Sequence, residues 1–195
     1  YYHLSYRLES FVHQTFENYV GRAQLPSAFL KKIDGFQYTK WSIFGLHLAL
    51  HEPVRLHAER FDPNIHRTMK WSLGAETMDD LLAAHQDVVA GRVPEIVQFG
   101  AGPLSVLDPT QAPPGKHTQY AWHVMPLNPD IGERDYETFK QEFAEKIIEK
   151  WAKYAPNMTR KNIIAQHVYT AREYTQTFPE MRHGDIFMGA FNAEQ

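Results

Sequence analysis

Hydrophobic and polar residues alternate along two stretches of the chain, and this period of two predicts β-strands. Residues 41–50 are largely apolar on both faces, which favours an internal strand of a sheet. Residues 117–124 carry Thr118, Tyr120, Trp122 and Val124 on one face and more polar side chains on the other. Shorter apolar runs at 96–99 and 163–169 predict two further strands.

Other stretches repeat apolar residues every three or four positions, the period of an amphipathic helix. Thr77 is placed to cap one helix, which Gly91 should end, and a short helix is expected at 26–33. Thr170 and Glu173 have the spacing of a capping box and predict a helix that follows them. The longest helix is expected over 134–155, and its apolar stripe comprises Tyr136, Phe139, Phe143, Ile147, Trp151 and Tyr154.

These strands and helices do not follow the regular alternation of a parallel α/β fold. Their order predicts an α+β fold, a mixed, mainly antiparallel β-sheet with helices packed on it. Residues 57–71 are charged and irregular and are expected to run over the surface, while the Pro-rich segment 109–115 predicts a stiff turn. No repeat or flexible linker divides the chain, so residues 1–195 are expected to form one domain.

Composition limits what the protein can be. With 195 residues, 43% of them hydrophobic, the chain can bury a substantial core. A net charge of −3 gives no basic surface of the kind that binds nucleic acid. The absence of Cys excludes disulfides and fits a reducing compartment. No apolar run approaches the roughly 20 residues of a membrane span, so we expect a cytoplasmic protein, with peripheral contact at a membrane as the alternative.

Residues 100–103, Gly-Ala-Gly-Pro, follow a strand-like segment, as a dinucleotide-binding loop would. The third glycine position of that motif is Ser105. Pro109 also prevents the long helix whose N-terminus would bind a phosphate. We therefore interpret this segment as a turn before the Pro-rich loop.

The 11 His residues raise the question of a metal site. His47 and His51 have a spacing that suits a metal on a helix, but they fall on a predicted strand. His117 and His123 share one face of their strand, and no third ligand follows at a readable spacing. The pattern therefore supports no metal site and favours hydrogen-bonded, surface or cavity-lining His.

Several segments, in this order, resemble the phytoene desaturase-like family of FAD-dependent oxidoreductases. They are WSIFGLHLALHEP at 41–53, LDPTQAPPGKHTQYAWHVMP at 107–126, KYAPN at 153–157 and GDIFMGAFNAEQ at 184–195. The last of them departs from the family, because Asn192-Ala193-Glu194-Gln195 stands where Ser-Leu-Asp-Gln is commoner. The substrate and the subfamily therefore stay open.

The resemblance implies that residues 1–195 are the substrate-binding domain of a larger flavoenzyme. The family binds FAD through an N-terminal GxGxxG and a Gly-rich C-terminal segment, and neither occurs in this sequence. FAD is thus expected in the full-length protein and not in this chain, which by itself should be inactive. The absent initiator Met and the end at Gln195, just after an apolar segment, agree with this expectation.

The resemblance also implies hydride transfer from a small lipophilic substrate to the flavin. The partners would be the FAD-binding domain of the same longer chain and, through surface exposed by excision, a second copy in a homo-oligomer. The aromatic residues indicate core packing, yet a substrate domain of this kind should use one sheet face as a cavity wall. His47, Trp122 and His123 are the candidates to face the substrate, and no catalytic acid or base is nominated. The alternative is a stand-alone, non-enzymatic α+β module that binds an apolar ligand or a partner protein.

Overall fold

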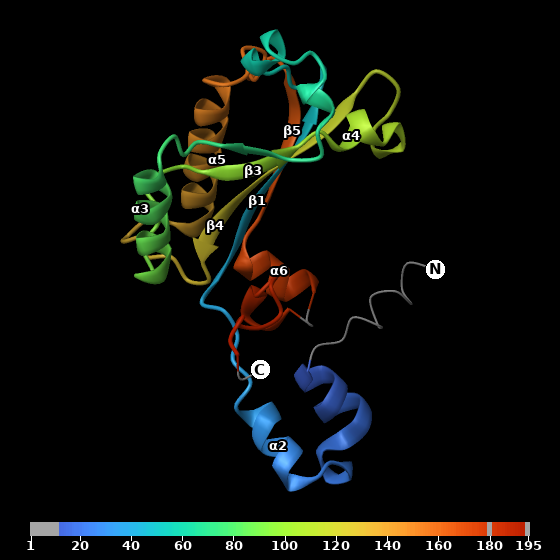
Figure 1. The fold of residues 1–195 in the computed structure, drawn as a ribbon, viewed down its shortest axis with the longest axis vertical. Helices are drawn as coiled ribbons and strands as arrows, with labels where there is room; N and C mark the ends of the chain where they lie inside the picture. The colour runs from blue at the N-terminus through green and yellow to red at the C-terminus, as the bar shows by residue number, and fades with distance from the viewer. Residues whose placement is uncertain (1–11, 179–180, 194–195) are drawn as a thin grey trace.

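A computed structural model describes residues 12–178 and 181–193 and contains a five-stranded β-sheet (Figure 1). Its strands are β1 (Trp41–Leu50), β2 (Trp71–Leu73), β3 (Phe99–Gly102), β4 (His117–Pro126) and β5 (Ile163–Tyr169). They lie in the order β2-β3-β4-β1-β5, and each neighbouring pair is antiparallel. The predicted α+β fold is confirmed, and the strand expected to be internal lies between β4 and β5.

The hydrophobic core lies between the sheet and helix α5 (Tyr136–Ala152). The ring of Phe143 on α5 contacts Phe44 on β1 with 4.9 Å between centroids, and Trp151 lies 5.4 Å from Phe99 on β3. The predicted apolar stripe of this helix is confirmed, because its central residues are all 0–2% exposed: Phe139, Phe143, Ile147 and Trp151. Burial of these large side chains is the main stabilisation of the fold.

Strand β4 packs its more polar face against α5, whereas the sequence indicated that its aromatic residues pack in the core. Gln119, Ala121 and His123 point toward α5 and are at most 2% exposed. Tyr120 and Trp122 point the other way; Tyr120 is buried, 8% exposed, whereas Trp122 is 42% exposed. The small side chain of Ala121 and the flat ring of His123 leave room for Phe143 of α5, which lies 4.9 Å from the His123 ring. Packing against this helix therefore decides which face is buried.

Two strands differ from the sequence predictions. Strand β3 begins at the last residue of the predicted segment 96–99 and continues through Gly100 and Gly102, which were interpreted as a turn. The missing glycine side chains leave space that the side chains of Lys70 and Tyr120 fill. Strand β2 lies at the edge of a segment expected to be irregular. Its three residues are too few to reveal an alternating pattern.

The predicted helix starts are confirmed. Helix α3 (Met78–Val89) begins where the Thr77 hydroxyl accepts the Asp80 N–H at 3.1 Å, and helix α6 (Ala171–Thr177) begins where Glu173 accepts the Thr170 N–H at 2.9 Å. Gly91, beyond α3, has a φ of 77°, which favours glycine. As Pro109 predicted, helix α4 (Leu104–Leu107) is short. Short helical turns lie in the connections: η3 (His57–Arg60), η4 (Ile65–Arg67), η5 (Pro109–Gln111) and η6 (Arg182–Gly184).

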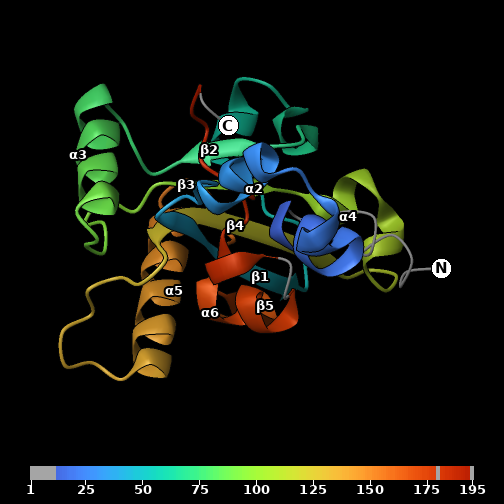
Figure 2. The same ribbon diagram turned by 90° about the horizontal axis from the view of Figure 1, so that it is seen from below.

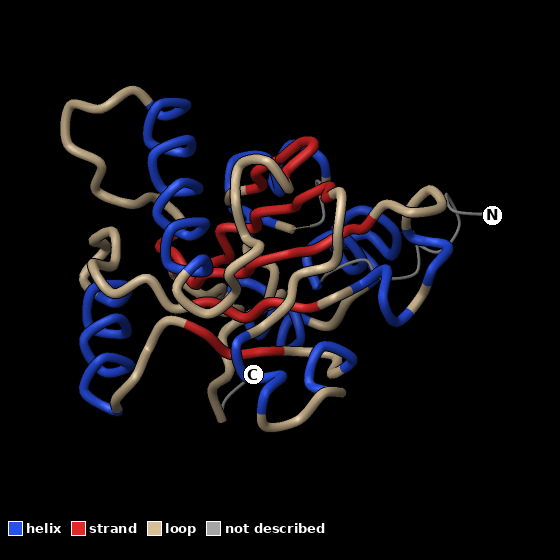
Figure 3. The backbone as a smooth tube through the Cα atoms, turned by 90° about the horizontal axis from the view of Figure 1, so that it is seen from above, coloured by secondary structure: helices blue, strands red, loops and turns tan. Residues whose placement is uncertain are grey.

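Helices near the N-terminus form a small lobe at one end of the molecule, below the sheet in Figure 1. It contains the π-helical turn η1 (Gln14–Gly21), the turn η2 (Arg22–Gln24) and helix α2 (Ser27–Asp34), which matches the short helix predicted at 26–33. Arg22 joins them through hydrogen bonds of 2.8 and 3.0 Å to Asp34. Helices α3 and α5 lie together on the side of the molecule away from the N-terminal end (Figures 2 and 3).

The chain segments that enter and leave the sheet run side by side (Figure 1). Asp185, which is fully buried, accepts the Thr39 N–H at 2.8 Å and the Phe187 N–H at 2.9 Å. The Ser42 hydroxyl donates to the Gly184 carbonyl. These bonds give the segment at 184–195 a structural role at the junction, although residues 194–195 lie outside the described part. Among the described residues, no helix combines the length and apolar character needed to cross a bilayer.

Candidate functional site

The sheet face opposite α5 carries aromatic and histidine side chains together with glycines. We call it the open face. Tyr174 of α6 lies at its margin. The strand register places these residues on it: Gly45, His47, Gly100, Gly102, Tyr120, Trp122, His167 and Tyr169. On this face His47 is opposite both Tyr120 and His167, while Gly45 is opposite both Trp122 and Tyr169. Four strands and one helix therefore contribute to a single surface.

The aromatic rings of the open face contact one another. Tyr169 stacks on Tyr174, with centroids 5.5 Å apart and ring planes inclined by 16°. The rings of His47 and His167 lie 5.8 and 4.6 Å from Tyr169, both in edge-on geometry. Such ring pairs add stability beyond the area they bury, so this arrangement holds the side chains in place.

The glycines allow these side chains to lie close to the backbone. A Cβ atom on Gly45 would be 2.6 Å from the Tyr174 hydroxyl oxygen, and one on Gly102 would be 2.7 Å from the Tyr120 hydroxyl oxygen. Contacts this short are repulsive, so a side chain at either position would displace a tyrosine. The glycines thus keep the open face flat.

The side chains of the open face are largely uncharged at neutral pH. Burial lowers the pKa of His47, and the neighbouring His167 lowers it further. Burial raises the pKa of Tyr174 to about 12, with smaller contributions from Tyr169 and Glu173. Burial likewise raises the pKa of Tyr120. The hydroxyl groups therefore remain protonated, and a charged group on this face is Lys70, whose side chain lies over Gly100.

A shallow hollow of about 350 Å³ lies on the open face next to His47. Its lining includes Ala49, Thr118, Ala165 and His167 from the strands, and Leu104 and Gln111 from the connection before β4. Its volume lies at the lower end of the range typical of small-molecule sites. Polar residues such as His47 and Thr118 line it together with apolar ones such as Ala49, so the hollow is a candidate site for a small molecule.

Comparisons with known proteins relate the chain to oxidoreductases. It is 27% identical over 155 residues to one of the limonene dehydrogenase subunits of Castellaniella defragrans, a match that covers 77% of this chain and 28% of that protein. It is 26% identical over 190 residues to pyridine nucleotide-disulfide oxidoreductase domain-containing protein 2 of Mus musculus, covering 93% and 32%. No protein-family model matches the chain.

The chain is distantly related to oxidoreductases. It spans about a third or less of the length of these curated relatives. These matches relate the chain to oxidoreductases in general. The narrower resemblance to phytoene desaturase-like enzymes stays a proposal.

The structure brings two of the three candidate substrate-facing residues to one face. His47 and Trp122 both lie on the open face, whereas His123 lies on the opposite face, 2% exposed. Neighbouring residues of a strand point to opposite sides, so Trp122 and His123 cannot share a cavity wall. The expected grouping of all three is therefore not found, and contact of His47 and Trp122 with substrate stays a prediction.

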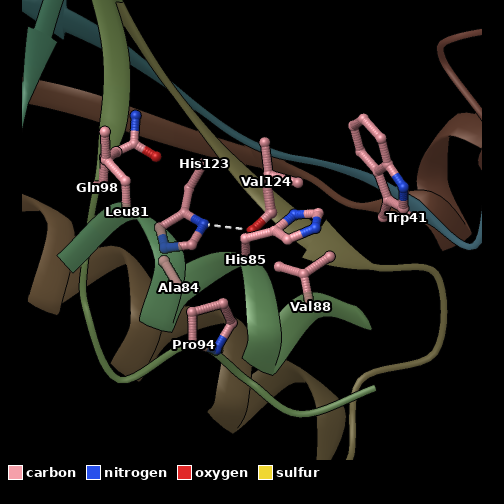
Figure 4. Close-up of a pocket in the computed structure, with 9 residues that line it drawn as sticks. All are labelled: Trp41, Leu81, Ala84, His85, Val88, Pro94, Gln98, His123 and Val124. Carbon is pink, nitrogen blue, oxygen red and sulfur yellow. Dashed lines mark hydrogen bonds between the residues drawn. The ribbon is translucent and has the colours of Figure 1, made fainter. Parts of the chain in front are cut away.

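His123 faces a separate, mainly apolar pocket of about 180 Å³ between α3 and the sheet (Figure 4). Its Nδ1 donates to the Val124 carbonyl at 2.6 Å. Burial lowers the pKa of His123 to about 4, partly opposed by hydrogen bonding to backbone groups that include those of Val124 and Ile96. His123 is therefore neutral in the folded protein at neutral pH.

The remaining candidate His residues make local contacts. His51 lies at the end of β1, where its Nδ1 is 3.0 Å from Lys116 Nζ. His117 Nδ1 is 3.2 Å from the Ser105 hydroxyl. In the part of the chain that the structure describes, no group of three or more His, Asp or Glu is arranged to hold a metal ion.

Sequence reasoning missed His167, Tyr169 and Tyr174 as members of the candidate site. The alternation within 163–169 already places Ala165, His167 and Tyr169 on one face of their strand. Nothing local indicates that this face adjoins His47, because the pairing of β5 with β1 joins segments far apart in sequence. Tyr174 belongs to a helix, and its position over Gly45 depends on how α6 packs.

The contact between Gly45 and Tyr174 predicts a stability effect that depends on one hydroxyl group. Gly45→Ala is expected to lower the free energy of unfolding by about 1–3 kcal/mol, because the new methyl group forces the Tyr174 hydroxyl away. Tyr174→Phe removes that hydroxyl, so the double variant should recover about 1 kcal/mol. Urea unfolding of the single and double variants measures this coupling. Tyr120→Phe is the matched control, since its hydroxyl lies over Gly102, and equal recovery with it would contradict the assignment.

Proposed function

We propose that this chain is the substrate-binding domain of a larger FAD-dependent oxidoreductase of the phytoene desaturase-like type, and that its open face covers the flavin and the substrate. The observation that carries the proposal is the glycine-lined aromatic surface of the open face, in a chain related to oxidoreductases. Planar, apolar molecules bind to surfaces of this composition.

The residues of the open face fit one side of a flavin. The ring system of a flavin is planar and aromatic, and aromatic side chains of the open face such as Trp122 and Tyr169 would pack against it. The segment with Gly100 and Gly102 does not form a phosphate-binding loop for FAD, because both glycines belong to a strand and pack against the side chains of Lys70 and Tyr120. Under this proposal the rest of the longer chain binds the dinucleotide part.

The bound flavin supplies the acceptor for a hydride from a substrate C–H bond. The chain described here would orient the substrate and exclude water from it. Aromatic side chains such as Trp122 and Tyr169 offer apolar contact, which favours a small lipophilic substrate. One relative is named for the dehydrogenation of limonene, an apolar hydrocarbon, and this supports the same class.

The lengths of the relatives support a longer protein. The matched region is 28% of one relative and 32% of the other, which leaves room for an FAD-binding domain. We propose that this domain of its own chain is the main partner of the open face, with a second copy of the protein as a further partner in a homo-oligomer.

The test is to purify the protein from its native cell and measure its intact mass and visible absorption. We expect a mass well above 22.7 kDa and the yellow absorption of a bound flavin. A colourless protein of 22.7 kDa would contradict the proposal. It would favour the alternative, a stand-alone module that binds an apolar ligand or a partner protein.

A fluorescence measurement tests whether the open face adjoins the flavin. Trp122 is the most exposed Trp on this face, so removing flavin from the full-length protein should increase its emission. In Trp122→Phe most of that increase should be lost. Trp71→Phe serves as the control, because Trp71 is buried and points to the α5 side of the sheet. Loss of the increase in the Trp71 variant alone would place the flavin elsewhere.

A further inference from the structure

Three side chains from three different elements converge above Gly45. Measured from the position that a Cβ of Gly45 would take, the Tyr174 hydroxyl oxygen of α6 is 2.6 Å away and His47 Nε2 of β1 is 3.4 Å away. Trp122 Cδ1 of β4 completes the group at 3.7 Å. At Gly102 the corresponding polar neighbours are the Met69 carbonyl oxygen at 2.5 Å and the Tyr120 hydroxyl oxygen at 2.7 Å, so Gly45 differs in that both of its polar neighbours belong to side chains.

Both polar atoms are available to a ligand. Within the described residues, neither the Tyr174 hydroxyl nor His47 Nε2 takes part in a hydrogen bond, although both side chains are half-buried. The two atoms are at most about 6 Å apart, a gap that one oxygen atom spans with two hydrogen bonds of about 2.8 Å each. Half-buried polar groups without partners favour a ligand that satisfies them.

The protonation states define what kind of ligand fits. Tyr174 keeps its proton at neutral pH and can donate a hydrogen bond. The neutral ring of His47 can accept or donate at Nε2, depending on its tautomer. A hydroxyl group satisfies both atoms in the first case, and a carbonyl oxygen does so in the second. A charged group is disfavoured, because neither partner carries a compensating charge.

We propose that Tyr174 and His47 form an oxygen-binding subsite, which holds the hydroxyl or carbonyl oxygen of an otherwise apolar substrate on the open face. The inference rests on the proposed function and adds a substrate class to it. The apolar part of the molecule would occupy the hollow of about 350 Å³ that begins at His47, while the ring edge of Trp122 borders the oxygen. This substrate class differs from the hydrocarbon for which one relative is named.

The test compares three ligands with one carbon skeleton, 1-(2-naphthyl)ethanol, 2-acetonaphthone and 2-ethylnaphthalene. NMR titration of the 195-residue chain, labelled with ¹⁵N in its His side chains, gives affinities and the shift of His47 Nε2. In Tyr174→Phe we expect affinity for the alcohol or the ketone to fall about fivefold to tenfold, as for one lost hydrogen bond. Affinity for the hydrocarbon should change less than about twofold, because it makes no polar contact.

Tyr154→Phe is the matched control, since its hydroxyl donates to Glu76 on the α5 side of the sheet and its removal should leave all three affinities unchanged. His47 Nε2 should shift on binding of the oxygen-bearing ligands and not of the hydrocarbon. Unchanged affinities in Tyr174→Phe, an equal loss in Tyr154→Phe, or no saturable binding of either oxygen-bearing ligand would each overturn the subsite. The titration needs no flavin, so its outcome is separate from the flavin content that tests the proposed function.

Discussion

Replacing Phe143 by Ala is expected to lower the free energy of unfolding by about 3–5 kcal/mol. Phe143 is 2% exposed and lies at the centre of the core, with its ring 4.9 Å from both Phe44 and His123 and 5.9 Å from Phe139. The substitution removes the buried ring and leaves a cavity between α5 and the sheet, and rigid neighbours on both sides limit collapse into it.

Urea unfolding measures this loss, and Phe61→Ala provides the matched control. Phe61 is 78% exposed, so the same chemical change there should alter the free energy of unfolding by no more than about 0.5 kcal/mol. Similar losses in the two variants would mean that Phe143 does not occupy the core position described. The comparison therefore tests whether α5 packs on the sheet as described. Because the open face is the face opposite α5, its assignment depends on the same placement.

Lowering the pH from 7 to 5 is expected to cost the protein about 2 kcal/mol of stability through His123 alone. The pKa of a His in an unfolded chain is near 6.5, whereas burial lowers that of His123 to about 4. Between these values the unfolded state binds a proton that the folded state excludes, so unfolding becomes more favourable as the pH falls. The contribution is fully present above pH 6.5 and is lost progressively down to about pH 4.

The variant His123→Asn tests this pH dependence. Its side-chain amide can still donate to the Val124 carbonyl but does not titrate, so stability should fall less between pH 7 and 5 than in the wild type. The exposed His57, changed to Asn, is the matched control and should keep the wild-type slope. If His123→Asn also keeps that slope, His123 does not titrate as its burial requires.

The local elements of the fold could be predicted from the sequence. Residues 41–50 and 163–169 form the strands that their patterns indicate, and Thr77 and Thr170 begin the helices that they were expected to cap. Such patterns work because side-chain direction repeats every two residues in a strand and capping needs only residues three apart. Strand β2 escaped the same reasoning, because three residues do not establish a period.

The candidate site could be predicted only in part. His47 and Trp122 were singled out, and both lie on the open face, but His123 was grouped with them although its side chain points into the core. Local sequence patterns also did not predict the strand at Gly100 and Gly102. These glycines form a strand rather than a turn. The side chains that pack over them, Lys70 and Tyr120, come from other parts of the chain.

The sequence by itself determined where most of the strands and helices form, that they build an α+β fold, and that the protein carries little net charge. Tertiary structure alone decided which face of the sheet is buried, because both faces of β1 are apolar and β4 offers polar side chains to the core. The pairing of β1 with β4 and β5, together with the packing of α6, brings His47, Trp122, Tyr169 and Tyr174 onto one surface. The pairing of β1 with β5 joins residues more than a hundred positions apart, and no local pattern specifies such a register.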